Sequence, residues 1–222
     1  MNRAAALLVA GVAFCVSAYA DVYGSPLVQH TDYTGTDYCT GCVLTYIPLS
    51  PIGLGQTLTS WAFYASANPS FPQHGPTGTG NLITPLLLHD NGGGTFQVVG
   101  VGTTRASTGP GIQSYSFGIV SGTDIIAAGD WFGWRDGGTT AGSGNNGTIS
   151  LSLNSGPGIN YSGYPLGDQK ALVLGGTYFS NFAAARTYSV QVITPEPGFY
   201  STMFTLALGL TGLVTVRRLR TA

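Results

Sequence analysis

The sequence predicts an all-β protein, an antiparallel β-sandwich with a jelly-roll-like arrangement of strands. Apolar and polar residues alternate with a period of two along many short runs. Residues typical of hairpin turns separate these runs. No stretch before Phe199 shows the 3.6-residue periodicity of a long amphipathic helix. A signal peptide is expected before this domain and a transmembrane helix after it.

The N-terminal residues 1–20 resemble a secretory signal peptide. Arg3 supplies a positive start, an apolar run extends from Ala4 to Val16, and small residues precede a cleavage point expected after Ala20. Cys15 leaves lipid attachment as an alternative, although the bulky Phe14 stands where that modification requires a small residue. An exported chain that begins at Asp21 is therefore expected.

Residues 21–193 form the predicted secreted domain, and their strands can be assigned from the alternation. In the run TISLSLNS, Ile149, Leu151 and Leu153 point to one side while Ser150 and Ser152 point to the other, which predicts a half-buried strand. Comparable runs lie around Trp61 and after Asn81, and begin at Thr95, Gln113, Asp124, Lys170 and Thr187. The residues expected in the core are Ile149, Leu151, Leu153, Trp61 and Phe63.

Glycine-rich turns connect these runs. The pairs Asn91-Gly92 and Asn146-Gly147 and the triplets 109–111 and 156–158 are typical of hairpin connections. Asp90 and Asp136 each precede such a turn and could offer oxygen ligands to calcium. Neither segment has the spacing of a known calcium loop, so turns are the preferred interpretation.

The charge of the domain excludes one class of partner. Residues 21–193 contain eight Asp and no Glu against four Lys or Arg, a net charge of −4. Because no basic patch is available to bind phosphates, nucleic acid is not expected as a partner.

The C-terminal residues 194–222 carry the strongest motif. Pro195-Glu196-Pro197 contains the chain's only Glu, and the 18 residues from Phe199 to Val216 include no Asp, Glu, Lys, Arg or His. As a helix they would be about 27 Å long, close to the roughly 30 Å of a bilayer's hydrocarbon core. Positive flanks stay cytoplasmic, so Arg217, Arg218 and Arg220 predict that the domain lies on the opposite side.

These three elements, in this order, resemble the PEP-CTERM sorting signal of Gram-negative bacteria. The resemblance covers about the last 29 residues. It implies that an exosortase, a membrane-embedded cysteine protease, cuts near Pro195-Glu196-Pro197 after signal peptidase has acted at the other end. It further implies an inner-membrane-anchored precursor, later release to the cell surface or medium, and an association with exopolysaccharide and biofilm. A helix that is retained as a permanent anchor is the alternative.

Cys39 and Cys42 enclose two residues. A thioredoxin-like redox pair should open a helix, but the sequence VLTYIPL that follows predicts a strand. In an exported protein we therefore expect a local disulfide between them, with redox and metal roles as alternatives. A zinc site needs about four ligands, which this chain does not group together, so no metal is expected.

The segment GDWFGWRDGG is the candidate binding surface. On a strand, Phe132 and Trp134 would face one side and Trp131 the other, so one tryptophan could be exposed. An exposed indole among charged residues suits the apolar face of a sugar ring. The candidate glycan-binding residues are Asp130, Trp131, Trp134, Arg135 and Asp136. The alternative is that all the aromatic residues fill the core.

No catalytic residue can be assigned from the sequence. The chain contains no G-x-S-x-G motif, and its three histidines, His30, His74 and His89, are isolated from one another. No cofactor is expected. The predicted role is that of a non-enzymatic surface or matrix protein, either structural or associated with extracellular polysaccharide or neighbouring surface proteins. The alternative is a secreted polysaccharide hydrolase that uses two of the Asp residues as acid and base or nucleophile.

Overall fold

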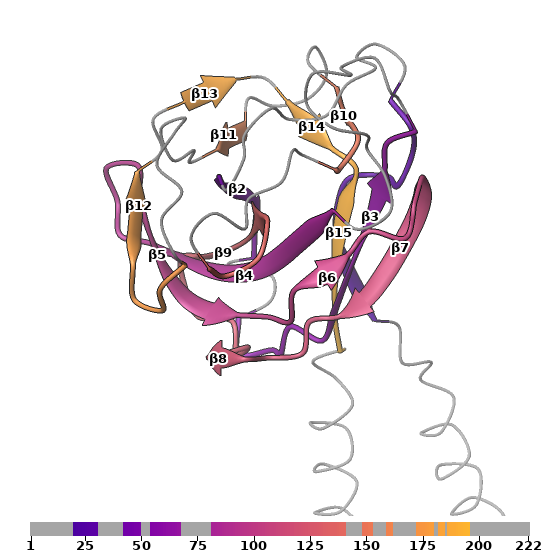
Figure 1. Cartoon of the computed structure of the whole chain (residues 1–222). Helices are drawn as coiled ribbons and strands as arrows, with labels where there is room; N and C mark the ends of the chain where they lie inside the picture. Colours follow the sequence, from indigo (N-terminus) through magenta and orange to yellow (C-terminus); the bar gives the residue numbers. More distant parts are fainter. Residues whose placement is uncertain are drawn as a thin grey trace, which may run out of the picture. The chain divides into compact units, whose positions relative to one another are not determined.

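The computed structural model describes residues 20–30, 42–49, 54–67, 81–140, 148–152, 159–161, 172–179, 182–184 and 186–195 of the 222-residue chain. It is an all-β structure with antiparallel sheets, one of them curled into a half-barrel (Figure 1). Val22–Thr194 form one compact unit. Among the described residues no helix has the length and apolar character needed to cross a membrane. The predicted signal peptide, apart from Ala20, and the predicted helix 199–216 lie outside these residues.

The smaller main sheet has four strands in the order β1, β15, β3 and β7. Their bounds are Asp21–Gly24, Val190–Thr194, Ser60–Ala65 and Gly111–Ser116. β3 is antiparallel to both of its neighbours, with Phe63 opposite Val190 on one side and opposite Gln113 on the other. The first and last described strands of the chain, β1 and β15, are therefore neighbours in one sheet.

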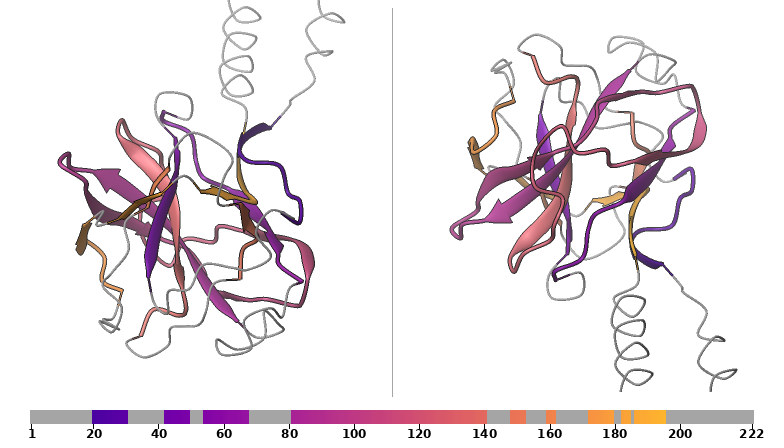
Figure 2. Two further views of the ribbon diagram at one scale, coloured as in Figure 1. Left: turned by 90° about the horizontal axis from the view of Figure 1, so that it is seen from above. Right: turned by 90° about the horizontal axis from the view of Figure 1, so that it is seen from below.

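The larger sheet has seven strands. Five follow the order β12, β5, β4, β9, β2, while β6 pairs with β4 and β8 pairs with β5. Their bounds, in the same order, are Thr177–Phe179, Thr95–Val101, Leu82–Asp90, Asp130–Asp136, Val43–Pro48, Arg105–Ala106 and Ser121–Gly122. Register shifts occur between Leu87 and Leu88 and between Thr45 and Ile47. Such bulges bend a strand and increase its twist, which favours the curvature visible in Figure 2.

Two further pairs complete the described strands. β10 pairs with β14, and β11 pairs with β13. Their bounds are Leu151–Ser152, Thr187–Tyr188, Ile159–Tyr161 and Phe182–Ala184.

Pro85 occupies the middle of β4, a strand with neighbours on both sides. Proline has no amide proton to donate to a ladder and is rarely found in such a place. Here it lies opposite Trp134 of β9, while on its other side the pairing with β6 has ended at Ile83 and that with β5 begins at Leu86. The carbonyl of Pro85 still accepts a hydrogen bond from the Gly102 amide at 2.9 Å. The gap between β6 and β5 therefore accommodates the proline.

The first core cluster lies between the two main sheets. Trp61 of β3 stacks on Phe63 at a centroid distance of 5.2 Å and approaches Phe132 of β9, in the other sheet, at 6.1 Å. The predicted burial of Trp61, Phe63, Ile149 and Leu151 is confirmed, and Leu153 lies outside the described residues. The buried members of this cluster are Leu44, Tyr46, Ile47, Leu49, Leu58, Trp61, Phe63, Ala65, Ile83, Leu87, Phe117, Ile126, Phe132, Trp134, Ile149, Leu151, Tyr188, Val190 and Val192.

A second core cluster covers the other face of the larger sheet. The alternation along β4 places Leu87 in the first cluster and Leu86 and Leu88 in the second. Both faces of the larger sheet are therefore apolar. The buried members of the second cluster are Val43, Leu86, Leu88, Phe96, Val98, Val101 and Tyr178, with Trp131 and Leu172 partly buried against them.

The burial of Ser150 and Ser152 corrects the prediction of a half-buried strand. Both serines are fully buried, as Ile149 and Leu151 are. The segment before residue 31 covers the serine side, because Ser150 Oγ accepts hydrogen bonds from the His30 amide at 3.0 Å and from Gln29 Nε2 at 3.3 Å. A long-range contact thus closes the face that the alternation left to solvent.

Two predicted strands begin later than their sequence runs. The run from Asp124 enters β9 only at Asp130, because a turn comes first, in which the Asp130 amide donates to the Ala127 carbonyl and Gly129 has a φ of +84°. The run from Lys170 becomes β12 only at Thr177, after a second turn that contains Gly175 with a φ of +79°. Glycine adopts this left-handed region without steric cost.

Candidate functional site

Strand β9 carries the predicted binding segment and has two differently placed sides. Phe132 and Trp134 belong to the first core cluster, whereas Trp131 packs against the second. This confirms the predicted division between the two faces. Gly133 lies between them, where a Cβ atom would be 2.1 Å from the carbonyl oxygen of Leu44 on β2. The close approach of the two backbones therefore requires glycine at this position.

Trp134 is an interior residue. Its exposed fraction is 1%, and its ring makes edge-to-face contacts with Tyr188 at 5.1 Å and with Tyr46 at 6.0 Å. These three aromatic residues join β9, β2 and β14. Trp134 therefore offers no ring face to a sugar in this structure, and its role is packing.

Tyr46 anchors the same cluster through its hydroxyl group. The hydroxyl lies 2.5 Å from Ser25 Oγ and accepts a hydrogen bond from the Tyr188 amide at 3.0 Å. Burial raises the pKa of Tyr46 above its ordinary value of 10.0, although its two hydrogen bonds act in the opposite direction. The neutral phenol is thus the form that the fold prefers.

Trp131 is the one candidate glycan-binding residue that reaches the surface of the described chain. It is partly buried, and it meets Phe96 of β5 edge to face at 5.8 Å. Its cross-strand neighbours are Leu88 on β4 and Pro48 on β2. Part of an indole supported by apolar neighbours is the kind of surface on which a sugar ring can stack.

The three charged candidates are all buried. Asp130, Arg135 and Asp136 each have an exposed fraction of 2% or less. Burial lowers the pKa of the Arg135 guanidinium below its usual value, and electrostatic interactions with Tyr178 and Asp136 oppose that shift. The structure places these side chains inside the domain, where a ligand on the surface would not meet them directly.

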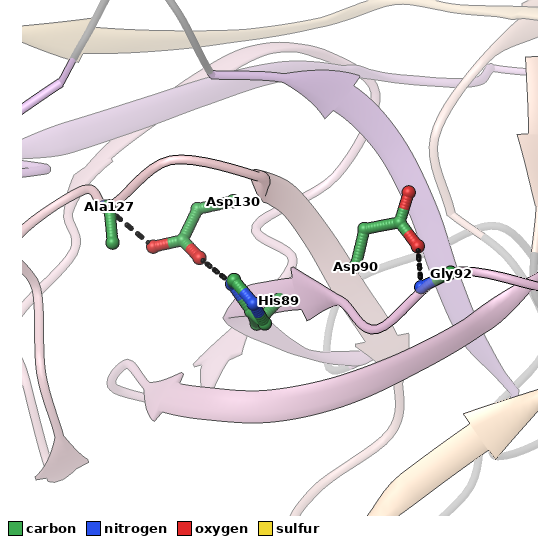
Figure 3. A network of polar contacts seen from close by, with 5 residues as sticks. All are labelled: His89, Asp90, Gly92, Ala127 and Asp130. Atoms are coloured by element: carbon green, nitrogen blue, oxygen red, sulfur yellow. Dashed lines mark hydrogen bonds and ion pairs between the residues drawn. The ribbon is translucent and has the colours of Figure 1, made fainter.

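A histidine–aspartate pair joins β4 to β9 at the end of the larger sheet. His89 lies opposite Asp130 in the antiparallel register, and His89 Nδ1 is 2.8 Å from Asp130 Oδ1 (Figure 3). The other carboxylate oxygen, Oδ2, accepts a hydrogen bond from the Ala127 amide at 2.8 Å. The His89 side chain is 37% exposed and that of Asp130 only 2%. A buried carboxylate therefore orients an imidazole that solvent can reach.

This pair has two of the three parts of a nucleophilic catalytic site. A carboxylate that holds one ring nitrogen leaves the other free to accept or donate a proton. Among the hydrogen bonds of the described residues, none joins His89 to a serine, threonine or cysteine side chain. The sequence around His89 does not indicate this partner, because only the register of β4 on β9 brings residues 89 and 130 together.

Asp90 follows His89 at the end of β4, and its hydrogen bonding confirms the prediction that it belongs to a turn. Its Oδ1 accepts a hydrogen bond from the Gly92 amide at 2.7 Å, and Figure 3 shows the carboxylate directed to that turn and not to His89. Three consecutive glycines follow with φ values of +81°, +63° and +77°. The described residues contain no group of three or more His, Cys, Asp or Glu that could hold a metal ion.

The remaining predicted sites are only partly described. Cys42 is buried and disulfide-bonded, but Cys39 lies outside the described residues, so their pairing stays a prediction. Pro195 ends the described chain directly after β15. The other sorting residues, Glu196, Pro197, Arg217, Arg218 and Arg220, and the histidine His74 also lie outside it.

Comparisons of the chain with protein-family models, curated proteins and solved structures produced no match.

Proposed function

We propose that this chain is an exported protein of the cell surface or extracellular matrix, processed by signal peptidase and an exosortase, with a non-enzymatic structural role. The observation that carries the proposal is the order of Pro195-Glu196-Pro197, an apolar run of 18 residues and an arginine cluster at the end of the chain. The resemblance of these elements to the PEP-CTERM signal supports an inner-membrane precursor that later reaches the surface.

The disulfide of Cys42 supports the same compartment. Disulfides persist in oxidising environments such as the periplasm and the cell surface, and they are rare in the cytosol. Cys42 directly precedes β2, whose Val43 is fully buried in the second core cluster. A covalent bond at this point would stabilise the start of an edge strand in a protein that works outside the cell.

We further propose that the domain is a β-sandwich of jelly-roll type. The two main sheets share the first core cluster, as the layers of a sandwich do. In this proposal, polysaccharide binds weakly through Trp131, and the buried Trp134 takes no part.

Mass spectrometry of the protein recovered from its native host tests the sorting proposal. We expect a mature chain that begins near Asp21 and ends close to Pro195–Pro197. Glu196→Ala should retain the full-length tail in the membrane, while Gln191→Ala, outside the motif on β15, should be processed as in the wild type. An intact tail in both the wild type and Glu196→Ala would instead support the permanent anchor.

Binding of the host's exopolysaccharide tests the proposed role. We expect weak binding that changes little with salt, because apolar stacking is not screened by ions. Trp131→Ala should abolish it, whereas Ile112→Ala, which removes an exposed apolar side chain on β7, should leave it unchanged. Binding that survives Trp131→Ala would contradict this part of the proposal.

A secreted polysaccharide hydrolase is the second candidate, and the His89–Asp130 hydrogen bond is the observation that favours it. A half-exposed imidazole oriented by a buried carboxylate has the arrangement of a general base. Release of sugars or ester groups from the polysaccharide by the wild type, lost in His89→Ala, would establish this activity. No turnover with either protein would leave the structural role.

A further inference from the structure

Six exposed apolar side chains gather on three loop segments of the domain. Large hydrophobic side chains that cluster at a surface mark a contact site more often than isolated ones do. Within the described parts of these segments, at 54–59, 117–126 and 172–176, the only charged residue is Asp124. We call the six residues the apolar rim; they are Leu54, Ile119, Val120, Ile125, Val173 and Leu174.

Backbone contacts bring the three segments together. The Gly55 amide donates to the Ile126 carbonyl at 2.8 Å, and Thr57 pairs with Ile125 in an antiparallel bridge, so residues 54–59 and 117–126 lie side by side. Gly122 of β8 packs so closely on the third segment that a Cβ atom there would be 2.6 Å from Leu174 Cδ1. Residues 119–126 thus connect the two other segments into one surface.

The rim lies at the end of the domain where β15 finishes. The Thr59 amide donates to the Ile193 carbonyl at 3.2 Å, and the Phe117 amide donates to the Thr59 carbonyl at 2.8 Å. The Leu58 amide donates to the Asp124 carbonyl at 2.8 Å. Figure 1 shows β8 and the C-terminal end of β15 at the same end of the domain. The chain therefore passes from Thr194 into the sorting tail next to the rim.

The length of the connection limits how far this end can be from the tail's apolar run. Only the four residues 195–198 separate Thr194 from Phe199. The five steps from Thr194 to Phe199 span at most about 18 Å in any conformation. If the run from Phe199 crosses the bilayer, as the proposed function requires, the end of β15 stays within about 18 Å of the lipid.

We propose that the apolar rim docks on the lipid surface of the membrane while the sorting tail anchors the precursor. This inference rests on the proposed function, since it needs the tail to be inserted. Apolar side chains enter the boundary between headgroups and acyl chains, and without Lys or Arg on the rim the contact does not depend on anionic lipid. After the tail is cut, the rim loses its tether and the domain leaves the membrane.

Fluorescent labels on the full-length chain test this docking. In a Cys15→Ser background, Val120→Cys and Ile112→Cys each supply one thiol for an environment-sensitive nitrobenzoxadiazole label, added without reductant so that Cys42 stays in its disulfide. Val120 and Ile112 are matched, with exposed fractions of 66% and 62%. Ile112 lies near the far end of the β3–β7 ladder, opposite Tyr64, whereas Ser60 next to the rim lies opposite Ser116.

In phosphatidylcholine vesicles we expect the label at residue 120 to shift to shorter wavelength and to be quenched by doxyl-labelled lipid, and the label at residue 112 to show neither change. Val173→Asp should remove the response at residue 120, and 0.5 M salt (on the order of a 4 Å screening length) should not. Equal responses at both positions, or none at either, would overturn the docking.

Three outcomes separate the two proposals. A chain that associates with vesicles through residues 195–222 but gives no response at residue 120 keeps the sorting proposal and overturns the docking. A chain that does not associate at all overturns both. A blue shift at residue 120 that grows with protein concentration in the absence of lipid would show that a second copy of the chain covers the rim, and it would also overturn the docking.

Discussion

The two faces of the larger sheet are both apolar, yet they are closed in different ways. The smaller sheet covers the first face, where Trp134 contacts Tyr46 and Tyr188 and all three are buried. The second face carries the smaller cluster, and there Trp131 stays partly exposed. Because β9 alternates between these faces, one strand of seven residues supplies both an internal support and a surface residue.

The largest expected effect separates the two tryptophans. Trp134→Ala removes a fully buried side chain and should lower the free energy of unfolding by about 3–5 kcal/mol. Trp131→Ala should have a clearly smaller effect because part of the side chain already contacts water. Urea unfolding followed by circular dichroism checks both values, and equal losses would contradict the difference between the faces.

Tyr46→Phe tests the hydrogen bonds of the first face. The variant keeps the ring but removes the hydrogen bonds of the Tyr46 hydroxyl with the Tyr188 amide and Ser25, which should cost about 1–3 kcal/mol of unfolding free energy. Tyr64→Phe, on the partly exposed side of β3, is the matched control and should change stability little. If Tyr46→Phe lowers the free energy of unfolding as little as Tyr64→Phe does, the hydroxyl of Tyr46 does not contribute to stability.

The raised pKa of Tyr46 predicts that the stability of the fold depends on pH in the alkaline range. Because the pKa of Tyr46 is raised in the folded state, the unfolded chain loses this proton first, near pH 10. The resulting stabilisation is fully present below about pH 10 and decreases as the pH rises further. Thermal unfolding between pH 8 and 11 should show a steeper decline for the wild type than for Tyr46→Phe, and parallel declines would exclude this contribution.

Gly133→Ala tests the contact between β9 and the edge strand β2. Its new methyl group would meet the Leu44 carbonyl, so the two backbones must separate, at a cost of about 1–3 kcal/mol. Ser114→Ala, at an exposed position of β7, should be nearly neutral. A stable Gly133→Ala variant would show that β2 can shift without loss.

The smallest effect on stability is expected for the pair of His89 and Asp130 at the end of the larger sheet. His89→Ala should cost less than about 1 kcal/mol, because loss of the partly exposed imidazole opens the Asp130 carboxylate to water, and Asp130 keeps its hydrogen bond from the Ala127 amide. A loss similar to that of Trp134→Ala would show that the pair is a structural element of the sheet.

The sequence predicts the all-β class well because alternation is a local property. It placed Trp61, Phe63 and Ile149 in the core and separated Trp131 from Trp134. Burial of Ser150 could not be predicted in the same way, since it depends on Gln29 and His30, which lie about 120 residues away along the chain.

Less of the candidate site than of the fold could be predicted from the sequence. Asp130 was considered as a sugar ligand, but the register of β4 and β9 pairs it with His89. Register depends on how whole strands align, and nothing in the residues near His89 indicates which carboxylate lies opposite. The burial of Arg135 could not be predicted either, because a charged residue on a predicted strand would ordinarily be assigned to the surface.

The neighbouring positions of β1 and β15 have a consequence for the time course of synthesis. Among the described strands, β1 lies beside β15 alone, and β3 lies between β15 and β7. A chain that is made from its N-terminus must therefore keep β1 and one edge of β3 unpaired until residue 194 has emerged from the ribosome. Contacts this distant in sequence form slowly. The order of the strands thus delays completion of the smaller sheet until the whole domain has been synthesised.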